Sequence, residues 1–142
     1  MKDPGQALKD AYSTALQALS VNSLKVPFYK TLKEAQGQYY MYVSDYTAVD
    51  DSNKDDFQTE CTITVNCTYV GNRGYQDETF VDDMANQVLQ TINVKATSYI
   101  SLTGFSLITT SLDNSIELTG NSKDEAALIR ALRFRHIIGE SS

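Results

Sequence analysis

The sequence lacks the residues on which most metal and redox chemistry depends. It has no tryptophan, a single histidine (His136) and only two cysteines among 142 residues. One histidine cannot form the imidazole cluster that holds zinc or iron in many enzymes. The Gly-x-Ser-x-Gly elbow, the Cys-x-x-Cys pair and the dinucleotide-binding glycine motif are missing as well. These absences argue against an enzyme, a metal site and a bound cofactor, and they favour a binding or structural role.

Long apolar runs are also missing. No stretch approaches the roughly 20 apolar residues of a membrane helix, and no basic segment followed by an apolar one opens the chain. We therefore expect synthesis in the cytosol and no membrane partner. A net charge of −6 makes wrapping of nucleic acid unfavourable, because neutralised phosphates dominate such affinity. The length and the 42% hydrophobic content are those of one globular domain spanning 1–142.

Two β-rich runs in the middle of the chain predict a long antiparallel hairpin. The first covers 39–49, the second covers 57–70, and residues 50–56 connect them. In the second run the odd-numbered residues from Phe57 to Tyr69 are mostly apolar and the even-numbered ones are polar. This period of two indicates a sheet with one dry face. The second run exceeds the usual strand length, so the hairpin can reach beyond its own core.

The two cysteines belong to this second run. Cys61 and Cys67 share its dry face and are separated by about 20 Å, which is too far for a disulfide between them. We expect both to be buried thiols of the core.

The first run carries tyrosines on both faces. Tyr40, Tyr42 and Tyr46 are predicted on one face, and Tyr39 and Met41 on the other. One interpretation is a central strand between two layers. The other is that a tyrosine face meets a neighbouring subunit, because tyrosine is enriched at such contacts.

The loop that connects the two runs is strongly acidic. Its aspartates are Asp50, Asp51, Asp55 and Asp56. The loop lacks the glycine and terminal glutamate of an EF-hand, so we do not expect calcium. Arg133 and Arg135 make the C-terminal run locally basic, and the two regions could complement each other between copies. The alternative is a solvated loop and an ordinary strand with arginines on its wet face.

The remaining elements are two helices and several strands. Apolar stripes predict helices over 4–19 and 77–92. A short extended segment at 26–29 contains a proline, which favours a sheet edge. Strands are predicted at 105–112 and 127–138, and a flexible loop over 113–126. His136 is expected to be a satisfied core residue or an edge residue. The class is α+β: an antiparallel sheet of about four to five strands with a long central hairpin and two helices packed on one face.

The element order and several short motifs resemble those of the tail-terminator proteins of long-tailed bacteriophages, also called tail-completion or head–tail joining proteins. The resemblance spans nearly the whole chain. Its motifs are Asp3-Pro4-Gly5-Gln6-Ala7-Leu8, Val26-Pro27-Phe28-Tyr29, Tyr40-Met41-Tyr42-Val43, Tyr69-Val70, Gly74-Tyr75 and Leu132-Arg133-Phe134-Arg135-His136-Ile137-Ile138. Residues 113–126 look longer than the usual link into the last strand of that family.

The resemblance implies a structural virion protein of the tail or neck, assembled in the host cytoplasm. Such proteins form a ring, usually of six copies, that ends the growth of the tail tube and joins the tube to the head connector or stopper. DNA passes through the channel of the ring. The acidic loop would then face the channel, where carboxylates let DNA slide, or the docking surface.

The resemblance also suggests which residues meet other subunits. Tyr40, Tyr42 and Tyr46 are candidates for the subunit interface, Arg133 and Arg135 for salt bridges across it, and the hairpin for extending a sheet. The alternatives are another neck, connector or tail-tube ring protein, or a small α+β ligand-binding domain or enzyme. An apolar pocket with convergent polar groups would favour the last of these.

Overall fold

The structure of the chain is a computed structural model, which describes residues 3–21, 23–30, 38–50, 57–72, 78–92, 102–121 and 125–140. The described residues form two helices, α1 (Gly5–Leu16) and α2 (Glu78–Thr91). The strands within the described residues are β1 (Ser20–Val21), β2 (Leu24–Lys25), β3 (Phe28–Tyr29), β4 (Tyr39–Asp50), β5 (Gln58–Asn72), β6 (Phe105–Asn121) and β7 (Glu125–Glu140). The predicted α+β class is confirmed.

Five strands form the main sheet, in the order β3-β4-β5-β7-β6. The predicted hairpin is its centre, with β4 and β5 antiparallel from Tyr39 opposite Tyr69 to Asp50 opposite Thr59. β3 lies at one edge and runs parallel to β4, so the sheet is mixed and the prediction of a purely antiparallel sheet was wrong. A period-two pattern reports which face a residue occupies, and it carries no information about strand direction.

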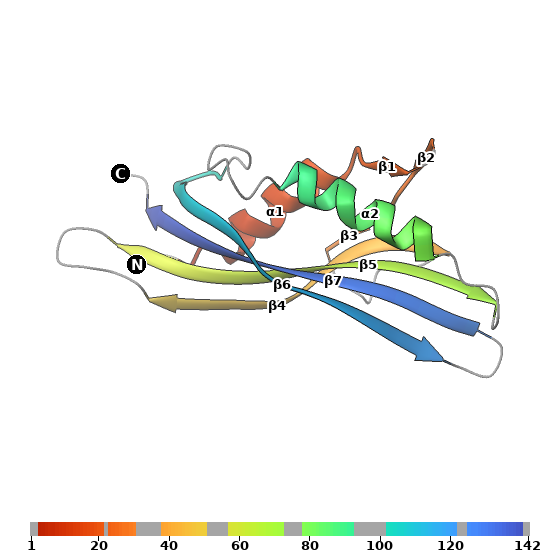
Figure 1. Cartoon of the computed structure of the whole chain (residues 1–142). Coiled ribbons are helices and arrows are strands. Elements are labelled where there is room, and N and C mark those ends of the chain that lie inside the picture. The colour runs from red at the N-terminus through yellow and green to blue at the C-terminus, as the bar shows by residue number, and fades with distance from the viewer. Residues whose placement is uncertain are drawn as a thin grey trace.

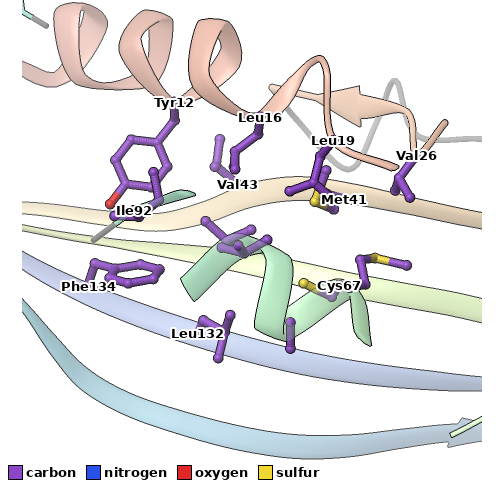
Figure 2. Packing of buried hydrophobic residues seen from close by; sticks show 14 of the residues in the cluster. Tyr12, Leu16, Leu19, Val26, Met41, Val43, Cys67, Ile92, Leu132 and Phe134 are labelled. Carbon is purple, nitrogen blue, oxygen red and sulfur yellow. The ribbon is translucent and has the colours of Figure 1, made fainter. Parts of the chain in front are cut away.

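Both helices lie on one face of this sheet (Figure 1). Figure 2 shows Tyr12 and Leu16 of α1 directed toward the strands, where Val43 and Phe134 line the same layer. These side chains belong to one buried cluster that both helices and β4, β5 and β7 share. No helix in the described part of the chain is long and apolar enough to cross a membrane.

Both cysteines are buried on the helix-covered face, as predicted. Cys61 and Cys67 are free thiols with no exposed surface. Burial raises the pKa of Cys67 to about 12, so its thiol stays protonated at neutral pH.

His136 lies in the same buried layer with both ring nitrogens occupied. The Tyr12 hydroxyl of α1 is 2.5 Å from Nε2, and the Thr110 hydroxyl of β6 is 3.0 Å from Nδ1. Burial lowers the pKa of His136 to about 4, so the ring is neutral at physiological pH. The prediction of a satisfied core histidine is confirmed.

A second long hairpin, β6–β7, is the main departure from the predicted structure. Residues 113–121, predicted as part of a flexible loop, continue β6, and β7 already begins at Glu125. The pairing runs from Phe105 opposite Glu140 to Asn121 opposite Ala126. Backbone hydrogen bonds to β7 hold this polar segment extended, because a paired neighbour overrides weak local β propensity.

Candidate interaction surface

The face of the main sheet opposite the helices is called here the open face. Figure 1 shows both helices on the other side of the sheet. Thr64, Asn66 and Thr68 of β5 belong to the open face and are nevertheless almost fully buried. Longer side chains on the flanking strands account for this: Tyr42 is the partner of Asn66 on β4, and Arg133 is the partner of Thr64 on β7.

Two of the three predicted interface tyrosines occupy the open face. Tyr40 and Tyr42 are half-buried there, with ring centroids 6.0 Å apart, and Tyr29 of β3 packs edge-on against Tyr40 at 6.2 Å. Burial raises the pKa of both Tyr40 and Tyr42, so their hydroxyls are neutral. The three rings form an aromatic cluster at the β3 edge.

Tyr46 lies on the opposite, helix-covered face, so its predicted position beside Tyr40 and Tyr42 was wrong. A β-bulge between Ser44 and Thr47 inserts one extra residue, with Asp45 in the left-handed region at φ 54°. One extra residue reverses the alternation of every side chain that follows it.

The flipped Tyr46 ties the start of α1 to the sheet. Its hydroxyl lies 2.6 Å from Asp3 Oδ1 and 3.5 Å from the Cys61 sulfur. Hydrogen bonds from this hydroxyl and from the Gly5 N–H lower the pKa of Asp3. A Cβ on Gly5 would lie 2.9 Å from the Tyr46 ring, so only glycine permits this close approach.

Arg133 and Arg135 project from β7 on the open face and bind carboxylates of their own chain. Asp113 Oδ1 is 3.0 Å from Arg135 Nη2, and Asp113 Oδ2 is 3.4 Å from Arg133 Nε. Glu60 Oε1 is 3.0 Å from Arg135 Nε. Asp113 reaches both arginines from a second bulge, between Leu112 and Asn114. Salt bridges of these arginines to another subunit stay a prediction.

One of the four loop aspartates lies within the described residues. Asp50 is the last residue of β4 and is exposed. Asp51, Asp55 and Asp56 lie outside the described residues, so a position of the loop at the channel or docking surface stays a prediction.

β6 adds apolar surface to the open face that the sequence-based reasoning missed. Ile116 and Leu118 are 44% and 48% exposed, beside Ala131 and Ile129 of β7. They border a hollow of about 220 Å³. Its lining comprises Asp45, Thr64, Asn66, Asn114, Ile116, Leu118, Ala131 and Arg133. The spacing of Ile116 and Leu118, two residues apart, is the period of a strand with one apolar face. Two residues among many polar ones were too few to predict a strand there.

Each of the two long edges of the main sheet has a neighbouring strand on one side only within the described part of the chain. β6 pairs with β7 alone, and β4 beyond Tyr42 pairs with β5 alone. Three successive antiparallel pairings separate β4 from β6, so these two edge strands run in opposite directions. An edge with free N–H and C=O groups is a template for pairing with another chain.

The described residues offer little for chemistry on a small molecule. No three His, Cys, Asp or Glu side chains within them gather closely enough to hold a metal ion. Three surface hollows lined by described residues have volumes of about 320, 240 and 220 Å³, at or below the small end of ligand pockets.

The fold occurs in a solved virion. A chain in the structure titled "Virion of native gene transfer agent (GTA) particle" superposes with a TM-score of 0.75, covering 98% of this chain and 99% of that chain. The two sequences are 12% identical, so the likeness establishes the fold. No protein-family model and no curated protein matches the sequence.

Proposed function

We propose that this chain is a non-enzymatic structural protein of a phage-like virion. The observation that carries the proposal is the fold shared, end to end, with a chain of the gene transfer agent virion. The family resemblance of the sequence motifs points the same way, and the small hollow of the open face suits contact with proteins better than catalysis.

Within such a virion, we propose that six copies form the ring that terminates the tail tube and joins it to the head connector, with DNA passing through. The two free edges support this arrangement. Because β4 and β6 run in opposite directions, β6 of one copy can pair antiparallel with β4 of the next. Such a head-to-tail contact is heterologous, and heterologous contacts close into rings when the rotation between copies permits.

The residues of the open face have separate roles in this proposal. Tyr40 and Tyr42 contribute the aromatic part of the subunit interface, and Arg133 and Arg135 its charged part. Tyr46 is engaged by Asp3 of its own chain and is no longer included. The acidic loop that begins at Asp50 faces the channel or a docking partner, which is the tail tube protein or the stopper protein.

Electron microscopy of the purified protein tests the ring. We expect closed rings, and light scattering after size exclusion should give a mass that is a multiple of the 15.8 kDa chain. Long stacked tubes would support a tail-tube protein in place of a terminator. A monomer in both measurements at high concentration would contradict the ring.

A pair of lysines on β6 should block ring assembly without unfolding the chain. Ile116→Lys with Leu118→Lys places two positive charges at exposed positions of the edge strand. Charged side chains on an edge strand, lysine above all, oppose the addition of another strand. We expect the ring mass to fall to that of the monomer, with circular dichroism unchanged. Leu24→Lys on β2 is the matched control, because Leu24 is 47% exposed and is not part of the main sheet. Equal loss of rings in the control would refute the edge contact.

A further inference from the structure

The last part of β4 is an exposed strand that carries an apolar side chain in solvent. Within the described residues, β3 accompanies β4 only as far as Tyr42, and the bulge of β4 ends at Thr47. Thr47, Ala48 and Val49 follow in regular register with β5, and all three are exposed, Val49 by 60%. Val49 lies on the open face, because its partner on β5 is Glu60. An apolar residue this exposed on an edge strand favours contact with another strand.

A matching stretch of β6 lies at the other long edge of the sheet. β6 has bulges at Leu107–Thr109 and Leu112–Asn114, after which its pairing with β7 is regular to the end of the strand. Ile116 and Leu118 belong to this regular stretch, where they are 44% and 48% exposed on the open face, and Glu117 is its one charged residue. β6 contains no lysine and no proline, which are common devices against unwanted strand pairing. The regular stretch can therefore accept a partner strand.

Backbone hydrogen bonds show which residue of the exposed part of β4 directs its N–H and C=O groups outward. The Val70 N–H donates to the Gln38 carbonyl at 2.6 Å, so the even-numbered residues of β5 direct their backbone groups toward β4. Thr47 and Val49 are partners of two such even-numbered residues and therefore bond to β5. Ala48, between them, directs its backbone groups away from β5.

The same reasoning gives the outward direction on β6. The Glu140 N–H donates to the Phe57 carbonyl at 3.2 Å, so the even-numbered residues of β7 face β5 with their backbone groups, and the odd-numbered ones face β6. Ile116 is the partner of the odd-numbered Ala131 and therefore bonds to β7. Glu117 directs its backbone groups outward. Outward backbone groups thus alternate along β6 with the exposed apolar residues.

We propose that Ile116 on β6 of one copy lies directly opposite Val49 on β4 of the next copy. Ala48 and Glu117 then form the adjacent hydrogen-bonded pair, and both apolar side chains lie on the open face. Val49 and Ile116 become a non-hydrogen-bonded pair, in which opposite side chains approach most closely. The occupant of the β4 edge is a second copy of this chain. The inference rests on the proposed ring and specifies the residues that meet in it.

The neighbouring registers cover the apolar residues less well. A shift by one residue places Val49 and Ile116 on opposite faces of the joined sheet. A shift that sets Val49 opposite Leu118 carries Ile116 past the end of β4 and leaves it exposed. A shift that sets Val49 opposite the polar Asn114 places Leu118 at the bulge of β4, whereas the proposed register sets Leu118 opposite Thr47.

Disulfide cross-linking of the double variant Val49→Cys, Ile116→Cys tests the register. Cα atoms of a non-hydrogen-bonded pair lie about 4.5 Å apart, which a disulfide spans. Within one chain the two residues are three strand spacings apart, about 14 Å, so only a bond between copies can form. We expect mild oxidation to give a ladder of covalent oligomers at multiples of 15.8 kDa in gels without reductant. The ladder should end at the copy number of the ring.

Matched variants make the result specific. Val49→Cys with Leu118→Cys and Val49→Cys with Asn114→Cys each move the second cysteine by two residues, to a Cα separation of about 8 Å. This is beyond the reach of a disulfide, so both should cross-link at least about tenfold more slowly. The unmodified chain should give no ladder, since Cys61 and Cys67 are buried. An equimolar mixture of the two single variants of the proposed pair should give covalent dimers and no longer ladder.

The other outcomes overturn the proposal. Faster cross-linking in either displaced pair would show a different register. Rings in electron micrographs without cross-links in any of the three pairs would exclude the pairing of β6 with β4 and retain the ring. Monomers in light scattering, without cross-links, would exclude the ring and the register together. If the double variant no longer assembles, the mixture of single variants, each with one substituted residue, decides the matter.

Discussion

Truncation of Phe134 to alanine is expected to cost about 3–5 kcal/mol of the free energy of unfolding. Phe134 has no exposed surface, and its ring packs edge-on against Tyr12 with centroids 6.2 Å apart. The alanine variant loses the transfer free energy of the ring and leaves a cavity between β7 and α1 that the close-packed core cannot fill. Urea unfolding followed by circular dichroism measures the loss.

Leu112→Ala is the matched control for Phe134→Ala. Leu112 is the direct cross-strand partner of Phe134 on the same face, yet it is 38% exposed. Its truncation should cost about 1 kcal/mol or less. Similar losses for the two variants would contradict the placement of the core under the helices and away from the β6 edge.

Acidification from about pH 7 to about pH 5 should remove about 2 kcal/mol of stability through His136 alone. The pKa of His136 is about 4 in the folded chain, below its ordinary value of 6.5. The unfolded chain therefore binds a proton before the folded chain does. The stabilising contribution is complete above about pH 7 and is lost as the pH falls through 6.5 toward 4.

The surroundings of His136 explain why the folded state resists the proton. Tyr12 from α1 and Thr110 from β6 occupy its two nitrogens, and Cys61 is its partner on β5. None of these groups is a carboxylate that would stabilise an imidazolium ion. Burial also raises the pKa of Tyr12 and of Cys61, so both stay neutral in this range.

His136→Gln isolates this contribution, because an amide can hydrogen-bond to both hydroxyls and does not titrate. Urea unfolding of both proteins between about pH 7 and about pH 5 should show a steeper loss in the wild type, by about 2 kcal/mol. Parallel pH profiles would show that carboxylates, and not the histidine, set the acid sensitivity.

The period-two pattern of the sequence predicted the face of the sheet that a residue occupies wherever the alternation along the strand is unbroken. It placed Cys61 and Cys67 in the core and Arg133 and Arg135 on the opposite side of β7 from Phe134. It failed at Tyr46, because the bulge at Ser44–Thr47 is a backbone irregularity with no sequence signal as strong as the pattern that it interrupts. It failed again at 113–121, where pairing with β7 supplies the order that local propensity does not.

Some residues of the candidate surfaces could likewise be predicted from the sequence, and others could not. Tyr40, Tyr42 and the two arginines could be chosen as interface candidates from the sequence, since their residue types are typical of interfaces. Asp113 could not, because it owes its position to a bulge in β6. A bulge re-aims a side chain by local geometry, which composition does not report. Phe57, predicted to face the dry side, is 58% exposed because β5 begins after it.

The sequence by itself determined the α+β class, the central hairpin, the two helices and the buried thiols, because burial of apolar residues imposes a regular period on each element. Only the tertiary structure decided that β6 is a full-length edge strand, that Tyr46 hydrogen-bonds to Asp3 at the start of α1, and that Asp113 binds both Arg133 and Arg135. These features depend on contacts between residues far apart in the chain. Such contacts set which strands pair, where the register shifts and which apolar side chains remain uncovered.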